Sequence, residues 1–422
     1  DPRKNVKGLL QAYSQLPEEL KRYKLLLVGK LLKPEIELID NWINQFQIDS
    51  DNVIKTGYVT DKDLVLLYRK CSLFIYPSLH EGFGLPVLEA MSCGTAVIGS
   101  NRTSVPEVIG NQKALFDPEN IDEMKNLIQK ALLDKQFYNE LLTNSHVQRS
   151  KFSWKITVDA INSACEKVIS DKKNLRVIYN WKDISTINNN NLNNLLLALR
   201  NDLLIKSKLD DKLISYISAS LDKMSFQIDS LIRSLYSDNK ITSWRVEGPL
   251  DSSYSLSILN RYFAEAINAK GYQLSLHNTE GYGDYLPNLK YLKSYKLIYS
   301  KLLESNKSNN INISNAIISR NLYPPRVKDM KGFFNLLHTY GWEESGFPSE
   351  WVDELNTYLQ GITVMSGFVK KVLIDNGVYI PIKVSGLGLD HIDKINIKNE
   401  YIIESKKYKI LHLSSCFPRK GI

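Results

Sequence analysis

Two carboxylates flank a glycine-rich turn where the chain reads HEGFGLPVLE, residues 80–89. This segment directly follows a predicted strand and opens a predicted helix, whose free N–H groups and positive dipole end can accept a diphosphate. Gly82 and Gly84 let the backbone come close to such a ligand. Glu81 and Glu89 can face one crevice at the carboxyl ends of the strands, where they would accept hydrogen bonds from sugar and ribose hydroxyl groups. Taken alone, the pattern fits equally well a plain glycine turn with two solvated glutamates.

The composition indicates a folded protein with more than one domain. At roughly 100–200 residues per domain, a chain of 422 residues is expected to form two or three domains. Hydrophobic residues make up 43% and charged residues 24%, and the mean hydropathy is −0.25, which excludes disordered and fibrous classes. The four cysteines are scattered, so a disulfide framework or a zinc site is not expected and a reducing cytoplasm fits best.

The net charge of +8 is uneven, because residues 1–170 hold 21 basic and 21 acidic residues and the rest of the chain carries the whole excess. The charges are interspersed and do not form a basic stripe with interleaved aromatic residues. Nucleic acid is therefore not an expected partner, whereas phosphorylated small molecules or an anionic membrane surface are. No apolar stretch approaches the roughly 18 residues of a membrane span, so any contact with the inner membrane should be peripheral. The expected location is the cytoplasm or the cytoplasmic face of the membrane.

Residues 24–168 alternate short apolar runs with amphipathic stretches. Strands are predicted at 24–29, 52–59, 72–78, 95–100 and 113–118, and helices at 34–46, 61–70, 86–93, 120–133, about 135–149 and 154–169. Continuous apolar strands separated by helices are typical of a parallel sheet covered on both faces. We therefore expect residues 1–170 to form a doubly wound α/β domain.

A second α/β pattern follows an Asn-rich segment. Residues 171–240 predict a helical linker, and a partner-binding coiled coil is the less favoured alternative because the heptads are few. Strands are then predicted at 242–250, 272–278, 315–321, 333–340, 361–367 and 382–388, and helices at 255–271 and 349–360. The predicted fold class is thus α/β, with two Rossmann-like doubly wound domains, residues 1–170 and 241–405, joined by a helical linker.

The stretch YPSLHEGFGLPVLEAMSCGTAVIGSNRTSVPEVIG (76–110) resembles the donor-binding half of retaining glycosyltransferases of family 4, which have the GT-B fold. The flanking GYVTDKDLVLLYRKCSLFIYPS and ALFDPENIDEM also resemble that family, so the likeness covers essentially residues 1–168. It implies roles for seven positions: Glu81 would contact the transferred sugar, the amides of Phe83, Gly84 and Leu85 the diphosphate, Glu89 the ribose, and the loop at Tyr58 and Val59 the nucleobase.

Arg3 and Lys4 match the basic pair that neutralises the departing diphosphate in this family. A fixed pair of cations stabilises charge that grows on a leaving phosphate without requiring a metal. Two mobile charges at a frayed end of the chain are the alternative. By this resemblance no metal and no cofactor are expected, and the UDP- or GDP-sugar is a substrate.

The C-terminal half, with RVEGPLDSSYSLSILNRYFAEAI, SRNLYPPRVKDM and LLHTYGWEESGFP, resembles the acceptor-side domain of glycosyltransferases encoded in bacterial polysaccharide clusters. In that fold the loop from Gly248 to Ser253, including Ser252, approaches the donor phosphates and the acceptor. His338 matches an active-site histidine beside the transferred sugar, and we expect it to face the crevice between the domains. The segment YGWEES adds Glu343 and Glu344, to which we assign no role.

The domain order differs from that of the family, whose members run acceptor domain first. Residues 417–422, FPRKGI, repeat residues 1–6, DPRKNV, so that Arg419 and Lys420 stand where Arg3 and Lys4 stand. We therefore expect the donor half of one unit to be joined to the acceptor half of the next unit of a tandem enzyme. Residues 406–422 would be the first strand and loop of a following donor domain, and the strand 408–415 is expected to fold back into the sheet of the first domain beside 24–29 or 72–78.

Together these features predict a retaining, metal-independent hexosyltransferase that moves a hexose from a nucleoside diphosphate sugar to a hydroxyl of a bacterial surface glycan or its lipid-linked precursor. A non-catalytic fragment or scaffold unit of a multi-domain glycosyltransferase is the alternative. A phosphorylase or epimerase on the same fold is less favoured, because we see no pyridoxal-binding lysine motif.

Overall fold

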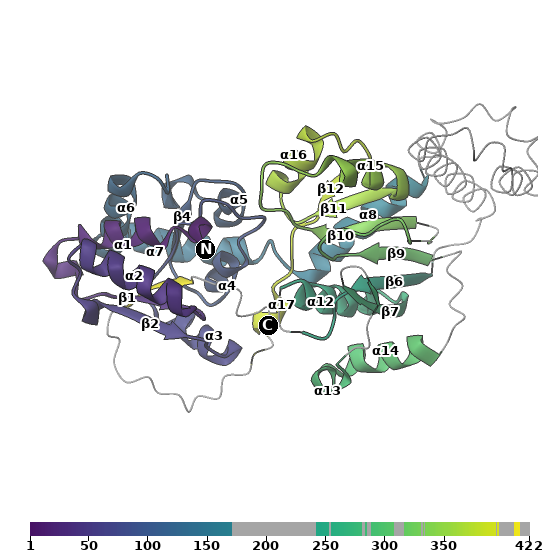
Figure 1. Ribbon diagram of the computed structural model, residues 1–422, viewed down its shortest axis with the longest axis horizontal. Helices are drawn as coiled ribbons and strands as arrows, with labels where there is room; N and C mark the ends of the chain where they lie inside the picture. Colours follow the sequence, from purple (N-terminus) through teal and green to yellow (C-terminus); the bar gives the residue numbers. More distant parts are fainter. Residues whose placement is uncertain are drawn as a thin grey trace, which may run out of the picture.

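The computed structural model describes residues 1–170, 242–252, 255–280, 283–284, 288–307, 316–330, 332, 334–393, 395 and 409–413. These residues form two α/β bodies that lie side by side (Figure 1). Within these ranges, every helix falls short of the length and apolar character that a membrane crossing requires. The linker predicted at 171–240 lies outside the described residues.

The first body alternates strands and helices in the predicted order. Its elements are short 3-10 helices at Pro2–Lys4, Glu18–Leu20, Ser50–Asn52 and Gln112–Ala114, the strands β1 (Lys24–Val28), β2 (Val53–Gly57), β3 (Leu73–Tyr76), β4 (Val97–Ser100) and β5 (Leu115–Phe116), and the helices α1 (Val6–Ser14), α2 (Lys33–Gln45), α3 (Asp61–Lys70), α4 (Leu85–Ser92), α5 (Val105–Ile109), α6 (Ile121–Leu133) and α7 (Lys135–Arg149). Strands β3 and β4 are buried at every residue, as a sheet covered on both faces requires.

A strand from the far end of the chain completes the first sheet. Strand β13 (Lys409–Leu413) lies between β1 and β3 and is parallel to both, which gives the order β2-β1-β13-β3-β4-β5. It thus occupies the position that we expected for residues 408–415. Ile410, Leu411 and His412 are fully buried. With β13 counted as the first strand, the order is that of a doubly wound dinucleotide-binding sheet, and it reverses direction between β13 and β3.

The second body contains a seven-stranded sheet of order β12-β11-β10-β9-β6-β7-β8. Its strands are β6 (Ser243–Gly248), β7 (Gln273–Glu280), β8 (Gly283–Asp284), β9 (Ala316–Arg320), β10 (Phe334–Tyr340), β11 (Gly361–Val364) and β12 (Ile382–Val384), and its helices are α12 (Ser255–Ala269), α13 (Leu289–Leu292), α14 (Lys296–Lys307), α15 (Ser349–Tyr358), α16 (Gly367–Asp375) and α17 (Asp390–Asp393). All pairings are parallel except that of β7 with β8. The strand order reverses direction between β6 and β9. Because both bodies thus contain a mostly parallel sheet with helices, the predicted α/β fold class is confirmed.

Helix α8 (Trp154–Ser170) follows the first body in sequence but packs on the second (Figure 1). The Trp154 ring stacks on Tyr262 of α12, with ring centroids 6.4 Å apart. Asp159 forms an ion pair with Lys270, and Asn162 accepts a hydrogen bond from Tyr272. By its contacts, α8 therefore belongs to the second body, although we expected the first domain to extend to residue 170. Periodicity predicts the helix but not the sheet that it covers.

Candidate active site

The loop between β3 and α4 lies at the point where the first sheet reverses direction. Crevices at the carboxyl ends of the strands beside such a point are where ligands bind in open parallel sheets. Gly84 precedes the first residue of α4 with φ 100° and ψ 47°, a left-handed conformation that favours glycine. In the first turn of α4, Pro86 has no N–H and the amides of Val87 and Leu88 donate to the Gly84 carbonyl, so a ligand at this turn would meet the amides of the turn itself. The turn that the sequence singled out therefore occupies the place where a phosphate group could approach.

Glu81 is held by a cation and a phenol. Lys4 Nζ forms an ion pair with Glu81 Oε1, and Tyr76 Oη donates a hydrogen bond of 2.7 Å to the same oxygen. The side chains of Lys4 and Glu81 are 12% and 7% exposed, so solvent screens this pair weakly. Burial, together with the neighbouring Glu81 carboxylate, raises the pKa of Tyr76 well above its usual value. Tyr76 thus remains a hydrogen-bond donor across the physiological pH range.

The loop backbone is fixed around Glu81. The amide of Glu81 donates to Thr103 Oγ1 over 3.1 Å, and its carbonyl accepts a hydrogen bond of 2.8 Å from Ser104 Oγ. The amide of Leu79 donates to the carbonyl of Arg3 over 2.7 Å. This last bond ties the Pro2–Lys4 turn to the loop, so that the backbone itself brings Lys4 next to Glu81.

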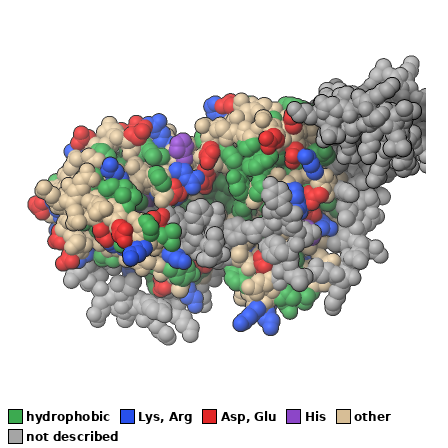
Figure 2. All heavy atoms as spheres, in the orientation of Figure 1, with side chains coloured by type: hydrophobic (Ala, Val, Ile, Leu, Met, Phe, Trp, Pro, Cys, Tyr) green, Lys and Arg blue, Asp and Glu red, His purple; other side chains and the backbone are tan. Residues whose placement is uncertain are grey.

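The second body closes over this loop. Arg3 forms an ion pair with Glu343, and the Gly82 carbonyl accepts a hydrogen bond of 2.7 Å from Ser366 Oγ. A Cβ atom added to Gly82 would lie 3.0 Å from the carbonyl oxygen of Trp342, so glycine permits a close approach of the two backbones. Figure 2 shows charged side chains of both signs gathered along the seam between the bodies.

A third contact joins the bodies at the first turn of α16. The Glu107 carboxylate, on α5, accepts hydrogen bonds from the amides of Gly367 (2.7 Å) and Phe368 (2.9 Å). A carboxylate at this position satisfies two free N–H groups and interacts favourably with the helix dipole. Sequence reasoning did not identify Glu107 or Ser366, because nothing in local spacing shows which residues meet across a domain interface. Tyr76 was missed because its position at the end of an apolar run indicates a strand residue.

Glu89 lies inside the first body and not on its surface. Its side chain is fully buried within α4, and Glu89 Oε2 accepts a hydrogen bond of 3.1 Å from Tyr68 Oη. A ribose hydroxyl would have to share or replace this bond. Tyr58, by contrast, is 64% exposed in the loop after β2, and Val59 next to it is half-buried. The structure thus does not bring Glu89 and Tyr58 together with Glu81 at one open surface.

The loop after β6 is held by α12. Asn260 Nδ2 donates hydrogen bonds of 3.0 Å to the carbonyls of Pro249 and Asn321. Arg261 Nη1 donates hydrogen bonds of 2.6 Å to the carbonyls of Leu250 and Ser252. Gly248 has φ 142°, and a Cβ atom there would lie 2.4 Å from Asn260 Nδ2. The start of this loop is therefore rigid; Ser253 lies outside the described residues.

His338 does not face the crevice, contrary to our expectation. It lies within β10, is fully buried, and stacks on Phe263 of α12 with ring centroids 4.1 Å apart. Its Nε2 lies 3.0 Å from Asn260 Oδ1, and since the Asn260 amide nitrogen donates to two carbonyls, the imidazole must be the donor. Burial lowers the pKa of His338 to about 3, so the ring is neutral. The sequence could not show that this strand residue points under a helix.

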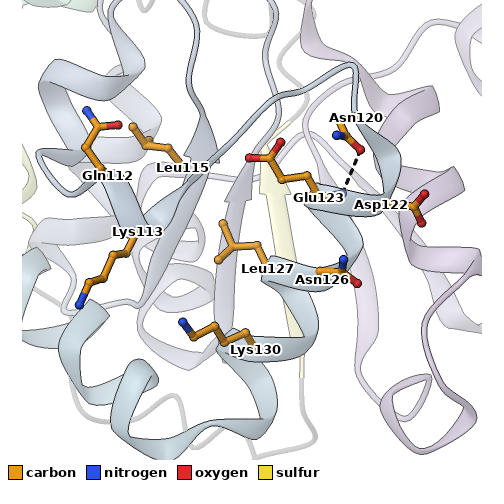
Figure 3. A pocket seen from close by; sticks show the side chains of 9 residues that line it. All are labelled: Gln112, Lys113, Leu115, Asn120, Asp122, Glu123, Asn126, Leu127 and Lys130. Carbon is orange, nitrogen blue, oxygen red and sulfur yellow. Dashed lines mark hydrogen bonds between the residues drawn. The ribbon is translucent and has the colours of Figure 1, made fainter.

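The remaining predicted residues and cavities add little to this site. Arg419 and Lys420 lie outside the described residues. Among the residues that the structure describes, no group of three or more His, Cys, Asp or Glu side chains could hold a metal ion. An open hollow elsewhere on the first body is formed by α6 and the segment before it (Figure 3) and is lined by Gln112, Lys113, Leu115, Asn120, Asp122, Glu123, Asn126, Leu127 and Lys130. None of the residues around Glu81 lines it.

Comparison with known proteins places the first body in a family. Residues 1–147 match the family of glycosyl transferases group 1. The serotype-specific mannosyltransferase WbdA of Escherichia coli is 47% identical over 155 residues, which are 36% of this chain and 19% of that protein. O-antigen chain mannosyltransferase B of Escherichia coli is 40% identical over 173 residues, 39% of this chain and 43% of that protein. The chain thus spans about a fifth to two fifths of the length of these relatives.

Two solved structures match the same share of the chain. Sucrose-phosphate synthase from Thermosynechococcus elongatus is 26% identical with a TM-score of 0.32 and covers 36% of this chain and 38% of its own. Anabaena HepE in complex with UDP and glucose is 23% identical with a TM-score of 0.33 and covers 36% of this chain and 41% of its own. The family match includes Lys4, Tyr76 and Glu81. Residues 1–147 are a glycosyltransferase domain of group 1.

Proposed function

We propose that the protein is a retaining hexosyltransferase that moves mannose from a nucleoside diphosphate sugar to a hydroxyl group of a bacterial surface glycan or its lipid-linked precursor. The observation that carries this proposal is the buried cluster of Lys4, Tyr76 and Glu81 at the reversal point of a group 1 glycosyltransferase domain. The names of the matched Escherichia coli relatives support mannose as the sugar.

In the proposed reaction the diphosphate lies against the turn that contains Phe83, Gly84 and Leu85 and at the start of α4. Lys4 and Arg3 stand beside this turn as fixed cations, which stabilise the charge that develops on the departing phosphate. We propose that this pair makes a metal ion unnecessary. The bond from the sugar C1 to the phosphate oxygen breaks, the acceptor oxygen bonds to C1 on the same face, and the acceptor proton passes to the leaving diphosphate.

Glu81 has a distinct role in this proposal. With one oxygen held by Lys4 and Tyr76, its carboxylate is fixed in orientation and can accept hydrogen bonds from hydroxyl groups of the transferred sugar. Discrimination among sugars is largest where a buried polar group is left unpaired by the wrong substrate. We therefore assign sugar selection to Glu81 and ribose contact to Glu89, the latter after Tyr68 yields its hydrogen bond.

The setting of the reaction is also part of the proposal. We propose that the enzyme works at the cytoplasmic face of the membrane, where a lipid-linked acceptor would be presented. The donor-before-acceptor order of the two bodies and the repeated Pro-Arg-Lys support our inference that they belong to consecutive units of a tandem enzyme. In that arrangement β13 takes the place of the first strand of the donor sheet.

Calorimetric titration of GDP, UDP, GDP-mannose and UDP-glucose into the chain tests donor binding. We expect either the guanosine pair, GDP and GDP-mannose, or the uridine pair, UDP and UDP-glucose, to bind. Glu89→Ala should weaken both the free nucleotide and its sugar, by about 1–3 kcal/mol as for hydrogen bonds to charged groups. In these titrations Glu81→Ala should leave the affinity for the free nucleotide unchanged and reduce the preference among nucleotide sugars. Unchanged affinities in both variants, with circular dichroism that shows an intact fold, would rule out this donor site.

A further inference from the structure

We propose that Tyr323, Trp342 and Trp351 form a stacking platform for a pyranose ring of the acceptor saccharide. The proposal deepens the function proposed above and rests on it, because it identifies where the acceptor lies relative to the donor loop. The three aromatic residues come from the loop after β9, the loop after β10 and the first turns of α15. They were not part of the residue set that the sequence predicted.

The three rings contact one another at steep or moderate angles. Tyr323 lies 6.1 Å from Trp342 and 5.9 Å from Trp351, measured between ring centroids, and the two tryptophan rings lie 5.8 Å apart. Phe347, which is 8% exposed, packs against both tryptophans from within, at 5.0 and 5.7 Å. A buried phenylalanine thus supports a layer of partly exposed rings, so that the platform is rigid before any ligand binds.

The outer ring of this group is open to solvent. Tyr323 is 59% exposed, whereas Trp342 and Trp351 are half-buried. Figure 2 shows hydrophobic side chains gathered on the second body next to the charged seam. A pyranose ring suits such a surface, because one face carries C–H groups that pack on an aromatic ring while its hydroxyl groups remain at the edge.

The platform lies at the edge of the second sheet where ligands are expected. Tyr323 follows β9 and Trp342 follows β10, and both loops leave the carboxyl ends of adjacent parallel strands. The sheet reverses direction between β6 and β9, so this edge is also its reversal point. The rigid turn at Gly248 leaves the carboxyl end of β6 at the same edge.

One of these residues, Trp342, lies against the donor loop, which supports a sugar and not an arbitrary apolar partner as the occupant. The carbonyl oxygen of Trp342 approaches Gly82 closely, and the next residue, Glu343, forms an ion pair with Arg3. The platform is therefore continuous with the interface that holds Glu81. A saccharide that rests on Tyr323 would have its neighbouring unit near the position proposed for the transferred hexose.

Polar groups border the platform. Glu344 is exposed next to Glu343, and its carboxylate can accept hydrogen bonds from equatorial hydroxyl groups. Behind the rings, Tyr340 is 2% exposed and its hydroxyl has no hydrogen-bond partner among the described residues. Burial, together with the nearby Tyr323, raises the pKa of Tyr340, so its hydroxyl stays protonated and can donate. An unsatisfied donor beneath exposed aromatic rings is a feature of a site for a hydroxylated ligand.

The test measures saccharide binding without nucleotide, by saturation-transfer NMR and calorimetry with an α-linked mannotetraose, and with maltotetraose for comparison. We expect the wild-type chain to bind mannotetraose, Tyr323→Ala to weaken that binding by about fivefold to tenfold, and Glu344→Gln to weaken it less. Affinities for GDP and UDP should not change in either variant. Tyr379→Ala is the matched control, because Tyr379 is a tyrosine of the same body that is 76% exposed, and it should behave as the wild type.

Four results would overturn the platform. The first two are no saccharide binding by the wild-type chain and a saccharide affinity of Tyr323→Ala equal to that of the wild type. The third is a loss of saccharide affinity in Tyr379→Ala equal to that in Tyr323→Ala. The fourth is a concentration-dependent dimer in gel filtration that Tyr323→Ala abolishes, because a second copy of the chain would then occupy the platform. Absence of nucleotide binding with intact saccharide binding would contradict the proposed donor site instead and leave the platform supported. The saccharide measurement therefore tests the platform, and the nucleotide measurement tests the donor site.

Discussion

Lys4 is the side chain on which the donor site depends most. Its charge is paired with Glu81 in a setting where both side chains are mostly buried, and a buried pair loses more when one partner is removed than an exposed pair does. The same ammonium group lies 3.5 Å from Tyr76 Oη, so three polar groups share one small volume. A diphosphate that arrives beside Glu81 would meet a cation already fixed in place.

Replacement of this cation should weaken diphosphate binding. Lys4→Met is expected to reduce the affinity for the preferred nucleoside diphosphate by about tenfold or more, because a hydrogen bond to a charged group is lost. Lys7→Met removes the same charge from an exposed position on α1 and serves as the control, with unchanged affinity. Calorimetry of the two variants measures these affinities. Equal affinities in both would mean that Lys4 has only a structural role.

His338 makes a prediction about pH. In the unfolded chain an ordinary imidazole binds a proton below about pH 6.5, whereas the folded chain resists protonation until about pH 3. The unfolded state therefore binds more protons in this window, so the free energy of unfolding is largest above it and falls as the pH is lowered. One such group contributes at most about 1.4 kcal/mol per pH unit.

Urea unfolding from about pH 7 to about pH 5 tests this account. His338→Gln should be less stable than the wild type near neutral pH, because Asn260 loses its partner and the ring packed on Phe263 is lost. The variant should also show a shallower fall in stability with decreasing pH. An identical pH slope in the two proteins would show that the folded ring takes up its proton normally.

Strand β13 belongs to the first sheet, although it lies more than three hundred residues from its neighbours β1 and β3 in the sequence. Leu411 is fully buried and pairs with Leu26 on one side and Phe74 on the other. Leu411→Ala should cost about 2–5 kcal/mol in the unfolding of the first body, as for other large-to-small core substitutions. Leu133→Ala, at a position 53% exposed on α6, is the control and should cost little. Hydrogen exchange at β1 and β3 measures the effect, and protection unchanged by Leu411→Ala would contradict the pairing.

Much of the secondary structure could be predicted from periodicity alone. The helix α3 was predicted at its observed bounds, and the strand residues 409–413 lie where a missing sheet position called for a strand. Tertiary placement could not be predicted in the same way. The amphipathic pattern of α8 does not distinguish between the two sheets, and the apolar run around His338 does not show that its ring lies beneath α12. Helices α1, α14 and α16 were not predicted from the sequence.

Among the described residues, a small set of polar contacts joins the two bodies, and we expect these contacts to set how firmly the donor loop is closed. Glu107 receives two amide hydrogen bonds from α16, and Ser366 donates to the Gly82 carbonyl. The double variant Glu107→Ala with Ser366→Ala should separate the bodies and increase the radius of gyration in X-ray scattering. Glu123→Ala, on the exposed face of α6, should not. If the double variant kept the wild-type scattering curve, other contacts would have to hold the bodies together.

Sugar transfer itself is the most direct test of the proposed function. The wild-type chain is mixed with GDP-mannose or UDP-glucose and mannotetraose, and the products are followed by mass spectrometry, with Glu81→Ala in parallel. The account predicts an oligosaccharide one hexose longer, formed with retained anomeric configuration and without added metal, and its loss in Glu81→Ala. An elongated product made at the same rate by Glu81→Ala, or no elongated product from a wild-type chain that binds both donor and saccharide, would contradict it.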